Sequence, residues 1–154
     1  MEGLERIVLA HPFFAGLETE LGPVVAGCAR NIRVGPGQYL AHEGDSADEF
    51  FLIRQGRVAL EILPPGRHAV VLSTESEGDI VGAYWLVPPY RWQCDARAVE
   101  LTRAIGIDAK CLRAKCDSDH HLGYELMKRF LPLIVQRLDQ TRLQMLDVYG
   151  SRPA

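Results

Sequence analysis

The sequence lacks several patterns that would assign a function at once. No apolar run reaches the roughly 20 residues that a membrane-spanning helix needs, and acidic residues precede the short apolar run at the N-terminus, unlike a secretory signal. Lys and Arg are scattered, and the net charge is -3, which is not the charge pattern of a nucleic-acid-binding face. We therefore expect a cytoplasmic protein without membrane association or direct DNA binding.

Cysteine is also scarce, and four cysteines in 154 residues are not the density of a disulfide scaffold. Cys111 and Cys116 lie close to His120 and His121 in the sequence, but a Cys-x4-Cys spacing followed by adjacent histidines is not that of a zinc site. On a helix these two cysteines point about 140° apart. The sequence therefore predicts free thiols, buried or partly exposed, and no metal site.

Catalytic patterns are missing as well. There is no Ser-His-Asp order, nucleophile elbow or Cys-His context. His42, Glu43 and Glu49 resemble part of a cupin metal motif, but Gly44 stands where that motif needs its second histidine. We therefore expect no catalytic residue, and we do not expect an enzyme.

What is present predicts a mainly β protein with flanking helices. A chain of this length is one domain, residues 1–154, with enough apolar residues for a full core. Residues 1–26 predict short helices that break or restart at Pro12. Residues 27–108 hold short runs in which apolar and polar residues alternate, as at Val58, Leu60 and Ile62, separated by turn residues. This pattern favours a jelly roll, a double-stranded β-helix, of about eight strands.

Residues 109–150 predict a short helix and then a long one over His120–Tyr149. Along the long helix, residues spaced by 3, 4, 3, 4 and 3 form a coiled-coil seam with one polar position. These residues are Leu131, Ile134, Leu138, Thr141, Met145 and Val148. We expect the seam to pair across a two-fold axis in a homodimer. Pro132 is expected to kink or divide the helix near Lys128–Leu131.

Two glycine signatures stand in the middle of the chain, one from Gly44-Asp45 to Gln55-Gly56 and the other at Gly78-Asp79-Ile80-Val81-Gly82. In their order and spacing they resemble the cyclic nucleotide-binding domain of the catabolite activator protein (Crp/Fnr) superfamily, and the resemblance covers nearly the whole chain. It implies a regulatory domain that senses a ligand and signals through its long helix. The superfamily's transcription factors continue into a helix-turn-helix. This chain lacks that motif, so we expect a stand-alone domain that acts on a protein partner.

The resemblance also places the ligand. It implies a phosphate on the backbone N–H groups of a short helix after Gly82, beside an arginine, and a ribose on a glutamate one residue after that glycine. Here Ala83 stands at the glutamate position, the closest guanidinium is that of Arg91, and Pro88 and Pro89 have no N–H to donate. We predict an altered ligand site, with Thr141 implied from the long helix. Its residues are Gly82, Ala83, Tyr84, Trp85, Arg91, Trp92, Gln93 and Thr141.

The identity of the ligand stays open between cyclic AMP or cyclic GMP and another small anion. In one interpretation Arg91, flanked by Tyr90 and Trp92, binds an anion or stacks on a base. In the other, Trp85, Tyr90 and Trp92 fill the pocket, and the roll serves as a protein-interaction or scaffold module. A redox or haem sensor that uses His11 or a cysteine is a further alternative.

Overall fold

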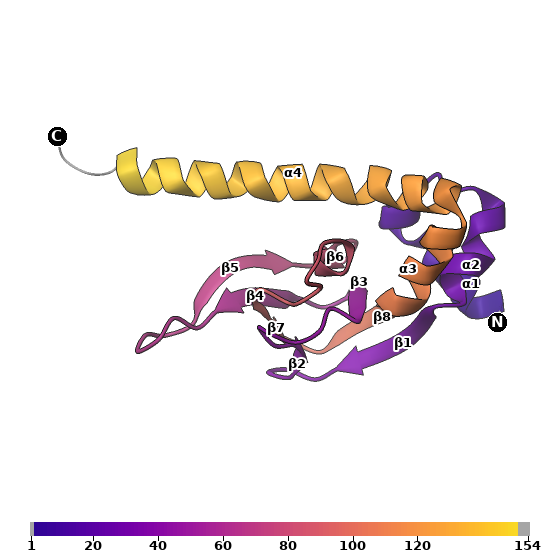
Figure 1. The fold of residues 1–154 in the computed structure, drawn as a ribbon. Coiled ribbons are helices and arrows are strands. Elements are labelled where there is room, and N and C mark those ends of the chain that lie inside the picture. The colour runs from indigo at the N-terminus through magenta and orange to yellow at the C-terminus, as the bar shows by residue number, and fades with distance from the viewer. Residues whose placement is uncertain (1, 151–154) are drawn as a thin grey trace.

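The computed structural model describes residues 2–150, with side chains described for residues 3–147. Eight strands form two four-stranded antiparallel sheets, in the orders β1-β8-β3-β6 and β2-β7-β4-β5. The strands are β1 (Ala29–Val34), β2 (Tyr39–Ala41), β3 (Glu49–Gln55), β4 (Val58–Ile62), β5 (Val70–Glu75), β6 (Ile80–Val81), β7 (Asp95–Ala98) and β8 (Thr102–Asp108). These eight strands confirm the predicted jelly roll, whose arrangement Figure 1 shows.

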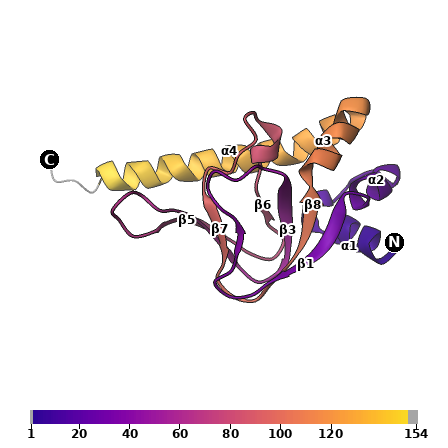
Figure 2. The ribbon, with the colours of Figure 1, turned by 60° about the horizontal axis from the view of Figure 1, so that its bottom comes forward.

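Helices lie at one end and along one side of this roll. The helical elements are α1 (Glu2–Ala10), η1 (Pro12–Phe14), η2 (Thr19–Leu21), α2 (Gly22–Ala26), η3 (Tyr84–Leu86), α3 (Ala109–Ser118) and α4 (His120–Gly150). Figures 1 and 2 show α1, α2 and α3 grouped at the end where β1 and β8 meet them, while α4 runs along the roll toward the end that carries the β4–β5 hairpin. Among the described helices, none combines the length and the apolar character needed to cross a bilayer.

Strand β3 is covered on both faces, which sets the layers of the molecule. Phe50 stacks on Trp85 at 5.0 Å between ring centroids and meets Phe130 of α4 edge-on, whereas Phe51 lies beside Trp92. Since successive side chains of a strand point to opposite faces, Phe50 faces Trp85 and the helix α4, and Phe51 faces Trp92 on the other side of the strand. A strand buried on both sides is a continuous apolar run, and Phe50–Ile53 is one.

The division of the long helix expected at Pro132 is wrong. α4 is one continuous helix with Pro132 inside it, at an exposed position. A proline within a helix costs about 3 kcal/mol, since it removes one backbone hydrogen bond and crowds the preceding turn. Buried Leu126 and Phe130 before it and half-buried Leu133 after it pack against the rest of the protein and offset that cost.

The expectation of free thiols is wrong for one of the two cysteines it named. Cys28 and Cys111 form a disulfide with 5.8 Å between their Cα atoms, across 83 positions of sequence. The bond joins the segment after α2 to the first turn of α3. Cys116, on a diverging face of α3, is unpaired and half-buried, and Cys94 is unpaired and buried.

We predict that removing this disulfide lowers stability strongly. For a loop of this length, the chain-entropy model gives about 4.5 kcal/mol, because the crosslink restricts the unfolded chain. Cys111→Ser should therefore shift the midpoint of urea unfolding well below that of the wild type, and a reductant should shift the wild type in the same way. Cys116→Ser is the matched control and should leave the midpoint nearly unchanged. A wild type that is insensitive to reductant would contradict the bond.

Candidate functional site

Gly82 and Trp92 are in tight contact at the centre of the predicted ligand site. Gly82 follows β6 with φ of +98°, and a Cβ placed there would lie 2.7 Å from the Trp92 ring. Trp92 is 3% exposed, and its ring centroid lies 5.6 Å from that of Tyr84 and 6.3 Å from that of Phe51. The indole therefore occupies the space directly beside the second glycine signature.

The turn η3 connects this space to the C-terminal helices. Trp85 is 1% exposed and lies 5.5 Å from Phe130 of α4, between ring centroids. Its backbone carbonyl accepts a hydrogen bond of 2.8 Å from Nη1 of Arg113 in α3. The same guanidinium lies over the ring of Tyr90, 4.3 Å from its centroid. A displacement of η3 would therefore disturb contacts with both α3 and α4.

Arg91 lies on the outer surface, away from Trp92. Its Nη1 donates a 3.0 Å hydrogen bond to the carbonyl of Gly44, and its backbone forms an isolated β-bridge with Ser46. Gln93 is also exposed and donates to the Arg91 carbonyl at 3.2 Å. In extended backbone, neighbouring side chains point to opposite sides. With Trp92 inside, Arg91 and Gln93 are directed outward, onto the loop between β2 and β3.

On α4, the side chain that reaches into the roll is that of Arg137. Its Nη2 donates a 2.7 Å hydrogen bond to the carbonyl of Ile80 and lies 3.8 Å from Oε1 of Glu75. Thr141 is exposed, and its hydroxyl donates to the carbonyl of Arg137, one turn earlier. The sequence analysis missed Arg137, although a signal was present. Arg137 follows Phe130 by seven positions and Leu133 by four, and these spacings put it on the apolar face of the helix that they share.

Three titratable groups, of which Cys94 is buried and Tyr84 and Glu75 are half-buried, interact with the charge of Arg137. Oη of Tyr84 and Sγ of Cys94 are 3.7 Å apart. Burial raises the pKa of both groups, and the positive charge of Arg137 acts against this rise. Burial also raises the pKa of the Glu75 carboxyl, while Arg137 and the hydroxyl of Ser73 lower it. The region around η3 therefore contains aromatic rings, such as Trp85 and Trp92, and also polar groups, such as Glu75 and Arg137.

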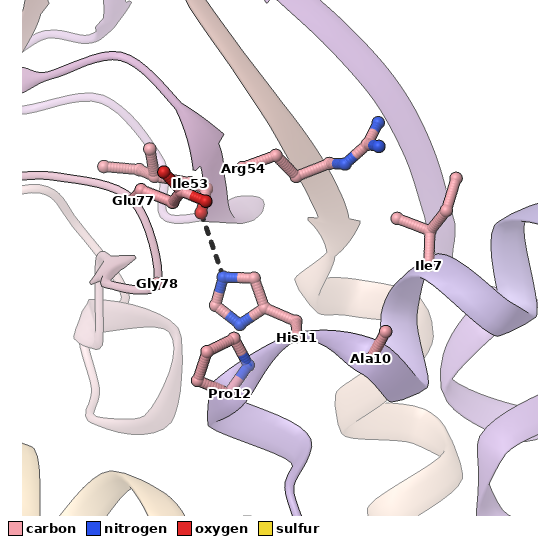
Figure 3. A pocket seen from close by; sticks show the side chains of 8 residues that line it. All are labelled: Ile7, Ala10, His11, Pro12, Ile53, Arg54, Glu77 and Gly78. Atoms are coloured by element: carbon pink, nitrogen blue, oxygen red, sulfur yellow. Dashed lines mark hydrogen bonds between the residues drawn. The ribbon is translucent and has the colours of Figure 1, made fainter.

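A separate hollow of about 540 Å³ lies between α1, η1 and β3, and His11 lines it (Figure 3). Nε2 of His11 donates to the carbonyl of Ile53 at 3.0 Å, and Nδ1 accepts the N–H of Phe13 at 3.2 Å. Burial lowers the pKa of this histidine and favours the neutral ring that such bonding needs. Both ring nitrogens are thus in use, so His11 gives the haem alternative no support.

Among the residues with described side chains, Glu18, His121 and Glu125 form a group of metal-ligand type. Nε2 of His121 lies 2.9 Å from the Glu18 carboxylate. Glu125 is already paired with Arg129 at 3.0 Å and with Lys128 at 3.3 Å, and these hydrogen bonds lower its pKa. The two cations neutralise the carboxylate that a metal would need, so we interpret the group as an ion-pair network.

The predicted seam forms an exposed apolar stripe on α4. Leu131, Ile134, Leu138 and Met145 are between 40% and 56% exposed. The side chain of Val148 lies outside the part of the chain whose side chains are described. Solvent-exposed apolar residues in a row along one helix are typical of an interaction surface.

Comparison with known proteins finds one matching family model and several solved structures with a similar fold. The family model for the cyclic nucleotide-binding domain matches residues 31–119. No curated protein matches the sequence. A solved structure described as a cyclic nucleotide-binding protein from Geobacter metallireducens GS-15 is 26% identical, with a TM-score of 0.77 over 90% of this chain and 99% of that one.

Two more distant structures share the fold. One is the regulatory domain of Toxoplasma gondii PKA with cAMP, 19% identical, with a TM-score of 0.62 over 73% of this chain and 43% of that one. The other is the regulatory subunit of a cAMP-independent protein kinase A from Trypanosoma cruzi bound to guanosine. It is 15% identical, with a TM-score of 0.70 over 99% of this chain and 52% of that one.

We predict that Gly82→Ala destabilises the protein more than Gly44→Ala does. Both glycines have positive φ, near +90°, but a Cβ on Gly44 meets no atom within 4 Å, whereas one on Gly82 meets Trp92. The Gly44 variant should lose about 1 kcal/mol from backbone strain, and the Gly82 variant about 2 kcal/mol more from overpacking. Urea unfolding followed by tryptophan fluorescence measures both. Equal losses would contradict the contact between Gly82 and Trp92.

Proposed function

Because this chain belongs to the cyclic nucleotide-binding domain family, we propose that it is a ligand-sensing regulatory domain whose long helix passes the signal to a partner. The observation that carries the proposal is the position of η3, which begins two residues after Gly82. Its Trp85 accepts a hydrogen bond from Arg113 of α3 and packs against Phe130 of α4. A ligand that favours one position of this turn would shift both C-terminal helices, since it binds the two arrangements unequally.

The proposed ligand is cyclic AMP or cyclic GMP, or another small anion. A related fold supports a cyclic nucleotide, because the Toxoplasma domain holds cAMP. The Trypanosoma subunit holds guanosine, which has no phosphate and extends the candidates to a nucleoside. Ala83 brings no hydrogen-bonding side chain, and Arg91 lies at the surface. We therefore propose that this chain holds its ligand with a set of side chains unlike the one its sequence family implies.

A second candidate function is a protein-interaction module that binds no small molecule. The observation in its favour is the burial of Trp85 and Trp92, which are 1% and 3% exposed. In this case the roll would be a rigid support that presents α4 to a partner. The two candidates differ in one measurable property, the binding of a nucleotide.

In both cases we propose that the chain forms a homodimer through the apolar stripe of α4 and acts on a further protein in the cytoplasm. Disulfides are uncommon in the reducing cytoplasm, so the Cys28–Cys111 bond gives the redox-sensor alternative a specific pair of residues. In that alternative, reduction by a dithiol would release α3 from the N-terminal segment.

We predict that calorimetric titration with cyclic AMP or cyclic GMP gives saturable heat, with a dissociation constant below about 1 mM. A dissociation constant of this size corresponds to a binding free energy of about 4 kcal/mol, which a few charge-assisted hydrogen bonds can supply. Titrations with 5′-AMP and with guanosine are the matched controls, since each lacks the cyclic phosphate. No heat from any of the four compounds would reject the sensor and favour the interaction module. Heat from guanosine alone would assign a nucleoside ligand.

We predict that Leu138→Asp converts a dimer into a monomer. A carboxylate in the middle of the apolar stripe would be buried without a partner at the interface, which costs several kcal/mol. Light scattering should give half the mass of the wild type. Gln140→Asp is the control, because this exposed position lies about 200° around the helix from Leu138. A monomeric wild type, or a Leu138→Asp variant that stays dimeric, would reject the stripe as the interface.

A further inference from the structure

Three arginines lie side by side on the neighbouring strands β1, β8 and β3. Arg33 of β1 is the direct partner of Arg103 in β8. On its other side, Arg103 pairs with Gln55 of β3. The register shifts at this point, and the extra residue of β3 is Arg54. Neighbouring strands are about 4.8 Å apart, so Arg33, Arg103 and Arg54 form a short line across the sheet, called here the arginine row.

The arginine row lies on the outer face of the sheet, at a part that the helices leave exposed. Paired residues of antiparallel strands share a face, and Phe50, which meets α4, is paired with Ile107. Four positions separate Arg103 from Ile107, so alternation along β8 puts both on that face, and Arg33 shares it as the partner of Arg103. The same count along β3 places Arg54 with Phe50. All three arginines are exposed.

The positive charges of the row have no counter-charge within the part of the chain whose side chains are described. There, no side chain or carbonyl forms a hydrogen bond or ion pair with any of the three guanidinium groups. Arg30 of the same strand differs, since it is bonded to Glu49 at 2.8 Å. Like charges directly opposite each other destabilise a sheet. An anion bound between Arg33 and Arg103 would remove this repulsion.

The hollow beside His11 adjoins the row, because Arg54 belongs to both. Figure 3 shows the Arg54 side chain extending toward Ile7 of α1, and the Glu77 side chain beside Ile53. The described lining of the hollow, about 540 Å³ in volume, includes no Phe, Tyr or Trp on which a nucleic-acid base could stack. Its apolar wall consists of Ile7, Ala10, Pro12 and Ile53. The surface therefore offers a line of cations next to an apolar recess.

We propose that the arginine row and this hollow together bind an acidic segment of a partner protein, in which an apolar side chain neighbours the carboxylates. An arginine binds a carboxylate through two parallel N–H bonds. Glu77 repels carboxylates from the hollow, so the apolar side chain is the part of the segment that enters it. A peptide supplies both groups in adjacent residues, whereas a nucleic acid lacks the apolar one and is repelled by a chain of net charge -3.

The position of the row keeps it accessible in the dimer proposed above. The sheet has β6 at one edge, where the carbonyl of Ile80 is bonded to Arg137 of α4, and β1 at the other. Figures 1 and 2 both show β1 and α4 on opposite sides of the roll. Pairing through the stripe of α4 therefore leaves the row uncovered on each protomer. The inference goes beyond the proposed function, since it requires neither a nucleotide nor a movement of η3.

The test follows the fluorescence anisotropy of a labelled, capped hexapeptide, EELLEE, at low ionic strength. The wild type should bind it, and added salt should weaken binding, because exposed charges are screened. We expect Arg33→Gln/Arg103→Gln to weaken binding at least about fivefold, as the loss of two exposed ion pairs does. Arg30→Gln is the matched control on the same strand and should change binding less than about twofold. A wild type that does not bind, or equal effects of the two variants, would overturn the proposal.

The hollow has its own test, in which the peptide EEGGEE lacks the apolar side chains. The wild type should bind EELLEE more tightly than EEGGEE. Ala10→Phe should remove this difference, since the ring would fill the hollow, and Ala10 is exposed, so the core is left intact. Equal affinities of the wild type for the two peptides, or a difference that persists in Ala10→Phe, would overturn the role of the hollow.

Two further probes identify the kind of partner. The uncharged peptide QQLLQQ should not bind, and binding equal to that of EELLEE would overturn the role of the row. An oligothymidylate with the same number of negative charges should bind more weakly than EELLEE. If it binds more tightly and loses affinity in Arg33→Gln/Arg103→Gln, the surface belongs to a nucleic acid and the proposal is wrong.

The wild type provides a check that does not depend on folding of the variants. The Nε–H resonances of Arg33, Arg54 and Arg103 should shift in ¹⁵N spectra when EELLEE is added, and unmoved resonances would overturn the proposal. None of these titrations contains a cyclic nucleotide. Binding of EELLEE by a protein that binds no nucleotide would thus reject the sensor and uphold this surface, and the reverse result would do the opposite.

Discussion

The contact between Gly82 and the indole of Trp92 is the constraint on which the rest of the site depends. At the end of β6, glycine provides both the positive φ and the space in which the ring lies. Once Trp92 points inward, the alternation of an extended chain turns Arg91 outward to the loop at Gly44. Arg91, the arginine that follows the second glycine signature most closely in the sequence, therefore lies outside the interior. Two arginines from the C-terminal helices contact this region instead, Arg113 at the carbonyl of Trp85 and Arg137 at that of Ile80.

Much of the fold was predictable, because short-range patterns determine it. The alternation of Val58, Leu60 and Ile62 and the turn glycines are local properties, and the structure has the expected eight strands. Two features depend on tertiary contacts and escaped prediction. Pro132 remains inside a helix because packing of that helix outweighs a local cost. The Cys28–Cys111 bond depends on the fold bringing together two positions that no sequence spacing relates.

The sequence predicted which residues gather at the candidate site better than it predicted which way their side chains point. Tyr84, Trp85 and Trp92 do gather around η3, as their closeness in sequence suggests. Sequence alone leaves open which member of an Arg-Trp pair points inward, because alternation fixes only that neighbours differ. Arg137 was not predicted, because the family resemblance implies a contact from the long helix at Thr141. The spacing of the buried face held the missing information, since Arg137 follows buried Phe130 by seven positions and half-buried Leu133 by four, which places all three on one side of the helix.

The bond between Cys28 and Cys111 makes the centre of the protein a closed covalent ring. β1 begins at Ala29 and β8 ends at Asp108, so all eight strands lie inside this ring. The N-terminal helices and α4 are attached to it as two tails. A single cut in any loop of the roll leaves the chain in one piece. Tension between the tails passes from Cys28 to Cys111 through the sulfur atoms and bypasses the sheets, so a partner that pulls on α4 draws on the N-terminal helices without pulling apart the strands.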